Sequence, residues 1–251
     1  MAITYHLVLL SVLLPLAGGA SLLRYQCGKN FTGDGILASN IGAGLADLVR
    51  ESSLLGSANS TRGAGDNTIY GLSLCRGDVT SGDCSTCIAD AAGNISAACA
   101  GHAQAIVWYD ICLIRFDTED FNGKWKNGSG WVVRSSREAP NPSIFVPEVE
   151  ELIRQVTAAA AGAGGRLFGR MARVIRRLEG LAVYGMAQCT RDLEGGSCRD
   201  CLDLLAGWIP VAGGCRNSSG CNLLYSSCVI RYETYNFLSP VDASSSASLQ
   251  F

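Results

Sequence analysis

The sequence predicts two tandem α+β domains, each with helices on one face of an antiparallel sheet. The first observation is a repeat: the pattern Y-G-x3-C-x8-C-x2-C begins at Tyr70 and again at Tyr184, 114 residues later. The second is the pattern C-x-I-R-[FY]-[DE], which begins at Cys112 and again at Cys228. A repeat of this length indicates that one domain occurs twice, and 251 residues suffice for two ordinary domains.

In the first copy, apolar periodicity predicts two helices. Asn40 can cap the first, and Asp83 can cap the second, which carries Cys84 and Cys87 on one face. The stretch 56–67 is rich in Gly, Ser, Asn and Asp, so we expect a loop there. Strands rich in apolar, β-branched and aromatic residues are expected at 69–74, 105–109 and 111–116.

The second copy follows a Gly- and Pro-containing connection over 117–146, in which 131–134 could add an edge strand. We expect Pro147 to open a helix whose first turn holds three glutamates, and 158–165 to be small and flexible. A strand at Tyr184, a helix over 198–208 and strands near 223–225 and 229–232 complete the copy.

The N-terminus predicts export. Residues 7–16 are apolar and 17–20 are small, as in a signal peptide, and the apolar run is too short for a membrane anchor. No later segment has the length and hydropathy of a transmembrane span, so we expect a soluble extracellular protein. The expected organisation is a signal peptide, first domain, linker, second domain and polar tail at 1–20, 21–122, 123–142, 143–240 and 241–251.

The cysteines indicate disulfides. Six of the twelve fall in each copy, and an even number in an exported chain indicates three disulfides per domain. Cys84/Cys87 and Cys198/Cys201 could instead be redox pairs or zinc ligands. The absence of a βαβ pattern and the oxidising compartment favour disulfides, so we expect no metal and no cofactor. Five N-x-[ST] sequons predict glycosylation at Asn30, Asn59, Asn94, Asn127 and Asn217.

Composition and motifs argue against an enzyme. The only histidines are His6 and His102, so the second copy has no histidine base for a nucleophile. His102, Asp110 and Asp117 are interpreted as scattered surface charge. A net charge of −2 gives no general attraction for nucleic acid.

Three groups of arginines leave alternatives open. The run from Arg166 to Arg177 is interpreted as a solvated face that balances Glu148, Glu150 and Glu151, and the alternative is contact with an anionic membrane, a cell-wall polyuronide or a protein. Arg115 and Arg231 lie between apolar residues on predicted strands. Each could form an ion pair within its domain or contact a ligand.

These cysteine patterns resemble the ginkbilobin-homologous domain of plant cysteine-rich repeat secretory proteins. The resemblance implies two helices against a five-stranded sheet in each domain. It also implies a role outside the cell, in the apoplast, in defence or stress signalling. For the first copy it implies three disulfides, which join Cys27 to Cys99, Cys75 to Cys84 and Cys87 to Cys112.

The second copy departs from that pairing. Cys215 corresponds to Cys99, but no cysteine precedes Cys189 where Cys27 would be its partner. Cys221 stands instead where the first copy has Ala105, so we predict a Cys215–Cys221 disulfide beside two that join Cys189 to Cys198 and Cys201 to Cys228. We also expect the helix over 147–161 to lack the disulfide attachment of its counterpart and to exchange its amides faster.

The family's mannose-binding members use an Asn, an Arg and a Glu, of which this chain keeps little. The corresponding residues are Gly28, Ile106 and Asp117 in the first copy, and Asn222 and Glu233 in the second. Asp117 and Glu233 remain as candidate ligand-binding residues. We therefore expect a non-enzymatic protein that binds an extracellular protein or a cell-wall glycan, and the alternative is a mannose-type lectin with antifungal activity.

Overall fold

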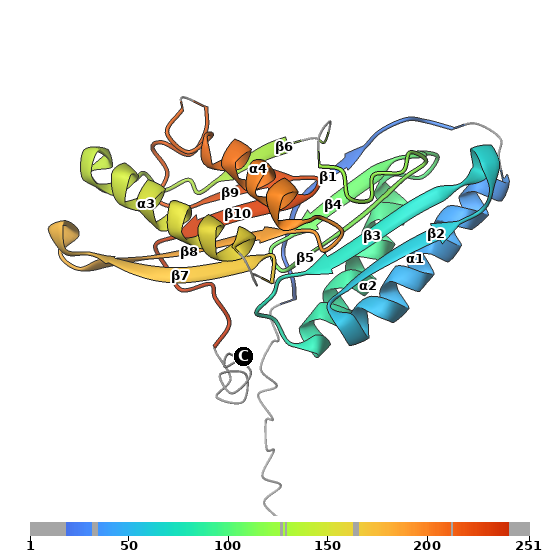
Figure 1. Cartoon of the computed structure of the whole chain (residues 1–251), viewed down its shortest axis with the longest axis horizontal. Coiled ribbons are helices and arrows are strands. Elements are labelled where there is room, and N and C mark those ends of the chain that lie inside the picture. Colours follow the sequence, from blue (N-terminus) through green and yellow to red (C-terminus); the bar gives the residue numbers. More distant parts are fainter. Residues whose placement is uncertain are drawn as a thin grey trace, which may run out of the picture.

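The computed structural model describes residues 19–31, 35–125, 128, 130–162, 166–211 and 213–240. Within them the chain folds into two α+β domains, each with two helices and a five-stranded antiparallel sheet (Figure 1). The sheet orders are β1-β4-β5-β3-β2 and β6-β9-β10-β8-β7, so corresponding strands occupy corresponding places. No helix in the described ranges is long and apolar enough to cross a membrane.

The elements follow the same order in both domains. The first domain contains β1 (Leu22–Cys27), α1 (Gly35–Leu55), β2 (Ser57–Arg62), β3 (Ile69–Cys75), α2 (Ser81–Ala98), β4 (Ala105–Tyr109) and β5 (Cys112–Asp117). The second contains β6 (Gly130–Arg134), α3 (Pro142–Ala161), β7 (Phe168–Ile175), β8 (Leu181–Cys189), α4 (Gly195–Ala206), β9 (Cys221–Tyr225) and β10 (Cys228–Glu233). Strand β6 thus lies within the segment 123–142 that we expected to connect the domains.

Each sheet buries one face under its two helices. In the first domain, α1 contributes Leu48 and α2 contributes Ile88 and Ile95, all fully buried. In the second, Leu152 and Leu202 do the same from α3 and α4. Burial of these apolar side chains is the main stabilisation of each layer pair.

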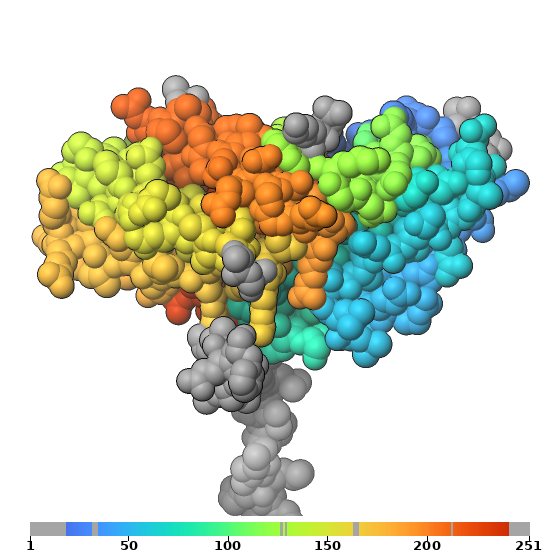
Figure 2. Space-filling view, viewed as in Figure 1, coloured from blue at the N-terminus to red at the C-terminus, as the bar shows by residue number. Residues whose placement is uncertain are grey.

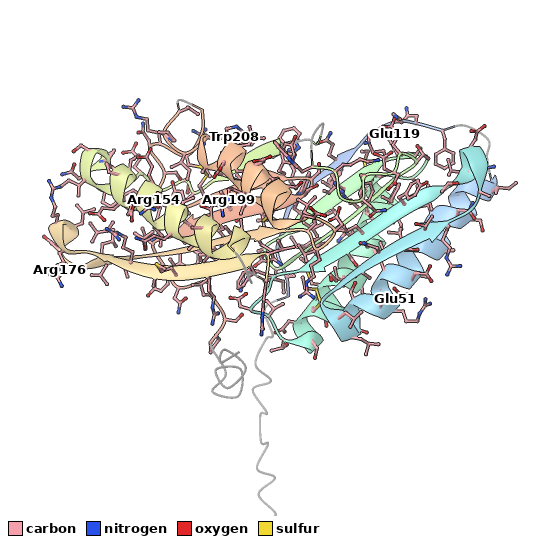
Figure 3. All side chains as sticks on the ribbon, in the orientation of Figure 1. Glu51, Glu119, Arg154, Arg176, Arg199 and Trp208 are labelled. Atoms are coloured by element: carbon pink, nitrogen blue, oxygen red, sulfur yellow. A yellow bond between two sulfur atoms is a disulfide. The ribbon has the colours of Figure 1, made fainter. Side chains whose placement is uncertain are left out.

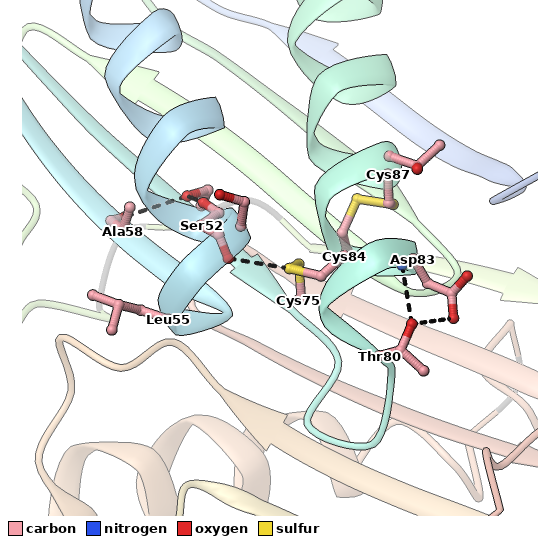
Figure 4. The surroundings of a disulfide bond; sticks show 12 residues. Ser52, Leu55, Ala58, Cys75, Thr80, Asp83, Cys84 and Cys87 are labelled. Atoms are coloured by element: carbon pink, nitrogen blue, oxygen red, sulfur yellow. Dashed lines mark hydrogen bonds between the residues drawn. A yellow bond between two sulfur atoms is a disulfide. The ribbon is translucent and has the colours of Figure 1, made fainter.

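The six disulfides of the structure are the six pairs expected from the sequence. Figure 4 shows Cys75 at the end of β3 bonded to Cys84 near the start of α2. The residue that caps α2 is Thr80 rather than Asp83, because the Thr80 hydroxyl accepts a hydrogen bond from the Asp83 amide. Asp83 lies three residues further along, as in a capping box.

Two helices begin earlier than expected. Helix α1 starts at Gly35, so Asn40 lies inside it and donates its side-chain amide to the Asn67 carbonyl. Helix α3 starts at Pro142, and Pro147 lies within it. The side chain of Phe145 is only 1% exposed and packs on the ring of Tyr232, which explains why the helix extends back past Pro147.

Two outer strands, β2 and β7, were not predicted from the sequence. Strand β2 occupies much of the expected loop 56–67 and pairs with β3. Its polar side chains are held by Asp47 of α1, which accepts hydrogen bonds from Ser60 and Arg62. Strand β7 carries part of the basic run and pairs with β8. Polar and charged residues are common in edge strands, which explains why the apolar pattern did not reveal β2. In β7 the apolar residues are interrupted by Gly169, Arg170 and Arg173.

The expected disulfide attachment of the first helix was wrong. Neither α1 nor α3 contains a cysteine, so the two helices do not differ in this respect. The Cys27–Cys99 bond instead ties the edge strand β1 to the end of α2. In the second domain Arg134 takes the ladder position of Cys27 and pairs directly with Cys221 on β9. In the second domain the corresponding cysteine therefore lies on the neighbouring strand, β9, and not on the edge strand.

The sheet faces without helices pack against each other and join the domains. Leu72, Trp108 and Leu113 of the first domain meet Leu224 of the second in one buried apolar cluster. The Trp108 indole donates to the Tyr225 carbonyl at 3.1 Å, so the polar group of this buried ring is satisfied across the interface.

Candidate functional site

Arg115 lies where the two domains meet. It extends from β5, and its Nη1 donates to the Ser226 carbonyl of the second domain at 3.1 Å. Its guanidinium stacks on Phe121 at 3.5 Å from the ring centre. Burial lowers the pKa of Arg115 to about 10, although nearby Asp192 and Asp117 favour the charged form. Its main direct partners are therefore backbone and ring atoms, not an ion-pair partner in its own domain.

A polar cleft of about 200 Å³ opens beside this arginine. Strands β1, β4 and β5 supply one side, and the segment that follows β5 supplies another. We call residues 118–125 strap 1. Figure 2 shows this region, in light green, at the surface where the two lobes meet. The strap residues that line the cleft are Glu119, Asp120, Phe121, Lys124 and Trp125.

The candidate Asp117 lies in this cleft with both carboxylate oxygens engaged. One accepts from the side chain of Gln104, and the other accepts from the Glu119 amide at 3.0 Å. Gly28 and Ile106 also line the cleft. A Cβ at Gly28 would lie 2.0 Å from Oε1 of Gln104, so the present packing leaves no room for an asparagine there. The family's mannose-binding set is therefore not reproduced.

The candidate Glu233 occupies the corresponding place in the second domain. It accepts from Nε and Nη2 of Arg231, at 3.3 Å each, which is the ion pair that the sequence left as one alternative. Burial raises the pKa of Glu233, and the arginine opposes that shift. Phe237 stacks on Arg231 at 4.2 Å, as Phe121 stacks on Arg115. Glu233 lines a separate groove with Ser135, Arg137, Ser219, Thr234 and Tyr235.

A second strap mirrors the first. We call residues 234–240 strap 2. Two residues after each stacked phenylalanine, a backbone amide donates to an aspartate of the other domain. Gly123 donates to Asp192 at 2.8 Å, and Ser239 donates to Asp78 at 2.9 Å. These aspartates are 114 residues apart, which is the shift of the repeat, but their role was not recognised from the sequence.

The basic run contains arginines that form ion pairs and arginines that are exposed to solvent. Arg170 bonds to Asp78 and Arg173 to Glu148, at 3.2 and 2.6 Å. Arg166, Arg176 and Arg177 are exposed, and Arg176 lies at the free end of the β7–β8 hairpin (Figure 3). The interpretation of this run as a solvated face therefore applies only to part of it.

The remaining candidates lie on the surface. His102 contacts the Ala100 carbonyl, and Asp110 accepts from the Ser21 amide, so they form no acid–base cluster with Asp117. Among the described residues no His, Cys, Asp and Glu side chains gather as a metal site. The sequon residues Asn30, Asn59, Asn94 and Asn217 are exposed, whereas Asn127 lies outside the described residues, as do 1–18 and the tail from 241.

Comparisons with known proteins agree with the fold and the repeat. The chain is 32% identical over 218 residues to a cysteine-rich repeat secretory protein of Arabidopsis thaliana, covering 85% of this chain and 81% of the relative. It is 31% identical over 238 residues to an antimicrobial ginkbilobin-2-like protein of Castanea crenata, covering 94% and 97%. The tandem DUF26 ectodomain of the Arabidopsis receptor-like protein PDLP8 superposes with a TM-score of 0.72 at 24% identity, covering 88% of this chain and 99% of that one.

The family model for the salt stress response/antifungal domain matches twice, at residues 26–119 and 134–235. Each match falls on one of the two sheets and its helices. The chain therefore belongs to the salt stress response/antifungal family and carries the family's domain in tandem.

Proposed function

We propose that this chain is a secreted, non-enzymatic protein that binds outside plant cells and acts in defence or stress signalling. The cleft between the domains is the observation that carries this proposal. It combines a buried guanidinium, carboxylates and aromatic side chains, a mixture typical of binding sites for polar ligands. The names of the relatives, as secretory and antimicrobial proteins, support the extracellular setting.

The partner class is a cell-surface protein or a cell-wall component. The test is affinity capture from plant cell-wall and membrane extracts with the glycosylated, disulfide-bonded protein. A cleft variant, Asp120→Ala with Lys124→Ala, changes exposed cleft residues, and Arg176→Ala with Arg177→Ala changes the distant hairpin as a matched control. We expect the cleft variant to lose roughly tenfold or more in apparent affinity, as when interface residues worth over 1.4 kcal/mol are removed. Equal capture by both variants would exclude the cleft.

A second candidate function is a lectin with antifungal activity. The relation to the Castanea antimicrobial protein favours it, because the aligned region covers nearly all of both chains. Ile106 cannot donate hydrogen bonds to a sugar, so mannose recognition would need a different set of groups. A glycan array separates the candidates: a sugar-specific signal supports the lectin, and protein capture with a silent array supports the interaction module.

A further inference from the structure

Each strap ends at an aspartate of the other domain, and we call the hydrogen bonds around that aspartate a clamp. The two clamps are unequal. At the end of strap 2, Asp78 accepts from Arg76 at 2.5 Å, from Arg170 at 3.2 Å and from the Ser239 amide at 2.9 Å. Its side chain is 3% exposed, and the two arginines come from different domains. Arg76 and Arg170 also bond Phe237 and Ser239 of strap 2 directly. Strap 2 is therefore held by several charge-assisted hydrogen bonds.

Strap 1 lacks both arginines. The residue two before Asp192 is Thr190, whose hydroxyl donates to the Ser227 carbonyl instead. The ladder position of Arg170, opposite Met186, corresponds to Asn59, opposite Leu72. Asp192 therefore accepts only from the Gly123 amide, and its buried Oδ1 has no hydrogen-bond partner within the described ranges.

The arginines that stack under the two straps, Arg115 and Arg231, also differ in how many of their N–H groups have an acceptor. The Nε and Nη2 groups of Arg231 both donate to Glu233. The same two groups of Arg115 are buried without an acceptor among the described residues, because Asp117 is engaged by Gln104 and the Glu119 amide. These two groups form one edge of the guanidinium, with two parallel N–H bonds that match the two oxygens of a carboxylate.

The clamp of strap 1 is thus the weaker of the two, and the closed position is unfavourable for the groups under it, although Glu119 pairs with Lys29 and Trp125 packs on Tyr225. Buried donors without acceptors destabilise the state that buries them. Opening the strap would expose these groups to the cleft, whereas opening strap 2 would break a satisfied cluster. Lys124, Lys29 and Arg115 face the four acids Asp117, Glu119, Asp120 and Asp192, so an anion would be held there by direct hydrogen bonds to the Arg115 guanidinium and not by a net positive charge.

We propose that strap 1 is a lid over Arg115, and that the exposed Nε/Nη2 edge binds a carboxylate group of the extracellular ligand. This inference rests on the proposed binding function of the cleft. Strap 2 is its closed counterpart and serves as an internal reference. The ligand class is therefore an acidic one, such as a uronic acid or the carboxylate of a peptide.

The lid is tested without any ligand. Phenylglyoxal modifies accessible guanidinium groups, and peptide mapping then gives the modification rate of each arginine in the native protein. We expect Arg115 to react at least tenfold faster than Arg231, and the Gly123 amide to exchange faster than that of Ser239. Protection of Arg115 equal to that of Arg231 would overturn the lid.

A single substitution should stabilise the closed position of strap 1. Asn59→Arg supplies the guanidinium that Arg170 provides in the other clamp, on an exposed edge strand that tolerates it. We expect several-fold slower modification of Arg115 in this variant. Asn59→Gln is the control, because it also removes the sequon but adds no charge. Equal rates in both variants would show that Asp192 does not limit opening.

The ligand class is tested by protection of Arg115 in the wild-type protein. D-Glucuronate and D-glucose differ in one carboxylate, so only glucuronate should slow the modification of Arg115. Equal protection by both sugars, or protection by neither, would overturn the carboxylate assignment while leaving the lid measurement intact. Equal capture from extracts by the cleft variant and the hairpin control would count instead against the proposed function of the cleft.

Discussion

The cysteine that follows the second helix forms its disulfide with a different strand in each domain. In the first, Cys27 on the edge strand β1 holds the end of α2 through Cys99. In the second, Arg134 replaces Cys27 at that ladder position, and Cys221, its direct neighbour on β9, bonds to Cys215. The comparison teaches that the cysteine after the second helix needs a partner nearby, and that either of two adjacent strands can supply it.

The two disulfides do not restrict the chain equally. Cys27–Cys99 spans 72 residues, whereas Cys215–Cys221 spans 6. In the loop-entropy description, the longer loop restricts the unfolded chain more, and the edge strand β6 gains no covalent attachment from the shorter one. The first domain should therefore depend on its disulfide more strongly.

The largest expected effect is the loss of unfolding free energy when either of these two disulfides is removed. Cys27→Ala with Cys99→Ala should destabilise the protein by about 4 kcal/mol, and Cys215→Ala with Cys221→Ala by about 2 kcal/mol. Urea unfolding followed by tryptophan fluorescence measures both under non-reducing conditions. Equal losses would mean that loop length does not decide the contribution of either bond.

The clamps should show the next largest difference. Asp78→Ala leaves Arg76 and Arg170 without their carboxylate, and breaking a buried ion pair in this way costs about 3 kcal/mol. Asp192→Ala removes one hydrogen bond from the Gly123 amide and should cost about 1 kcal/mol. The same unfolding measurement applies, and a larger loss in Asp192→Ala would reverse the proposed order of the clamps.

Two carboxyl groups should give the domains opposite pH dependences. Hydrogen bonds from Arg62 and Arg50 hold the pKa of Asp47 well below its usual range. Its contribution is therefore present above the unfolded value of about 3.9 and is lost as the pH falls below it. Burial raises the pKa of Glu233, so its contribution is present at low pH and is lost as the pH rises above about 4.3.

The free energy of unfolding of Asp47→Asn and Glu233→Gln, measured as a function of pH, tests these two dependences. Asp47→Asn should reduce the loss of stability between about pH 4 and pH 2, and Glu233→Gln should reduce the loss above about pH 4.3. If Asp47→Asn lost as much stability as the wild-type protein over this pH range, the ion pairs of Asp47 would not contribute to the pH dependence of folding.

The edge strands should differ in local stability. Strand β1 is tied to the rest of its domain by a disulfide, and β6 is not. We expect amides of β6 to exchange several-fold faster than those of β1, which is a smaller effect than global unfolding. Equal protection would mean that the packing of Trp131 on Arg24 and Gln26 replaces the covalent attachment.

Glycosylation should have the smallest effect on the fold. We expect glycans on the exposed residues Asn30, Asn59, Asn94 and Asn217 in both domains, with little change in unfolding after their enzymatic removal. Site mapping by mass spectrometry checks occupancy. An unmodified Asn94 would fit its hydrogen bond to the Tyr109 hydroxyl, which a glycan would alter.

The sequence by itself determined the tandem organisation, the helix–strand order of the apolar elements and the rearranged Cys215–Cys221 bond. The tandem organisation and the order of elements depend on residue type and spacing, which the repeat shows twice, and the Cys215–Cys221 bond follows from comparing the cysteines of the two copies. Helix faces such as those of Leu48 and Ile88 could also be read from periodicity, because apolar burial follows it directly.

The edge strand β6 was expected at 131–134, but only the tertiary structure decided the outer strands β2 and β7, the helix starts and the cleft. Strand β2 is polar and β7 carries two arginines, and the pairing of both depends on the neighbouring strands β3 and β8 rather than on their own pattern. The start of α3 depends on Phe145 reaching Tyr232. Arg115, Asp78 and Asp192 act between domains, so their partners lie 111, 161 and 69 residues away in the chain. No local pattern encodes such contacts, because they exist only once the two sheets have packed together.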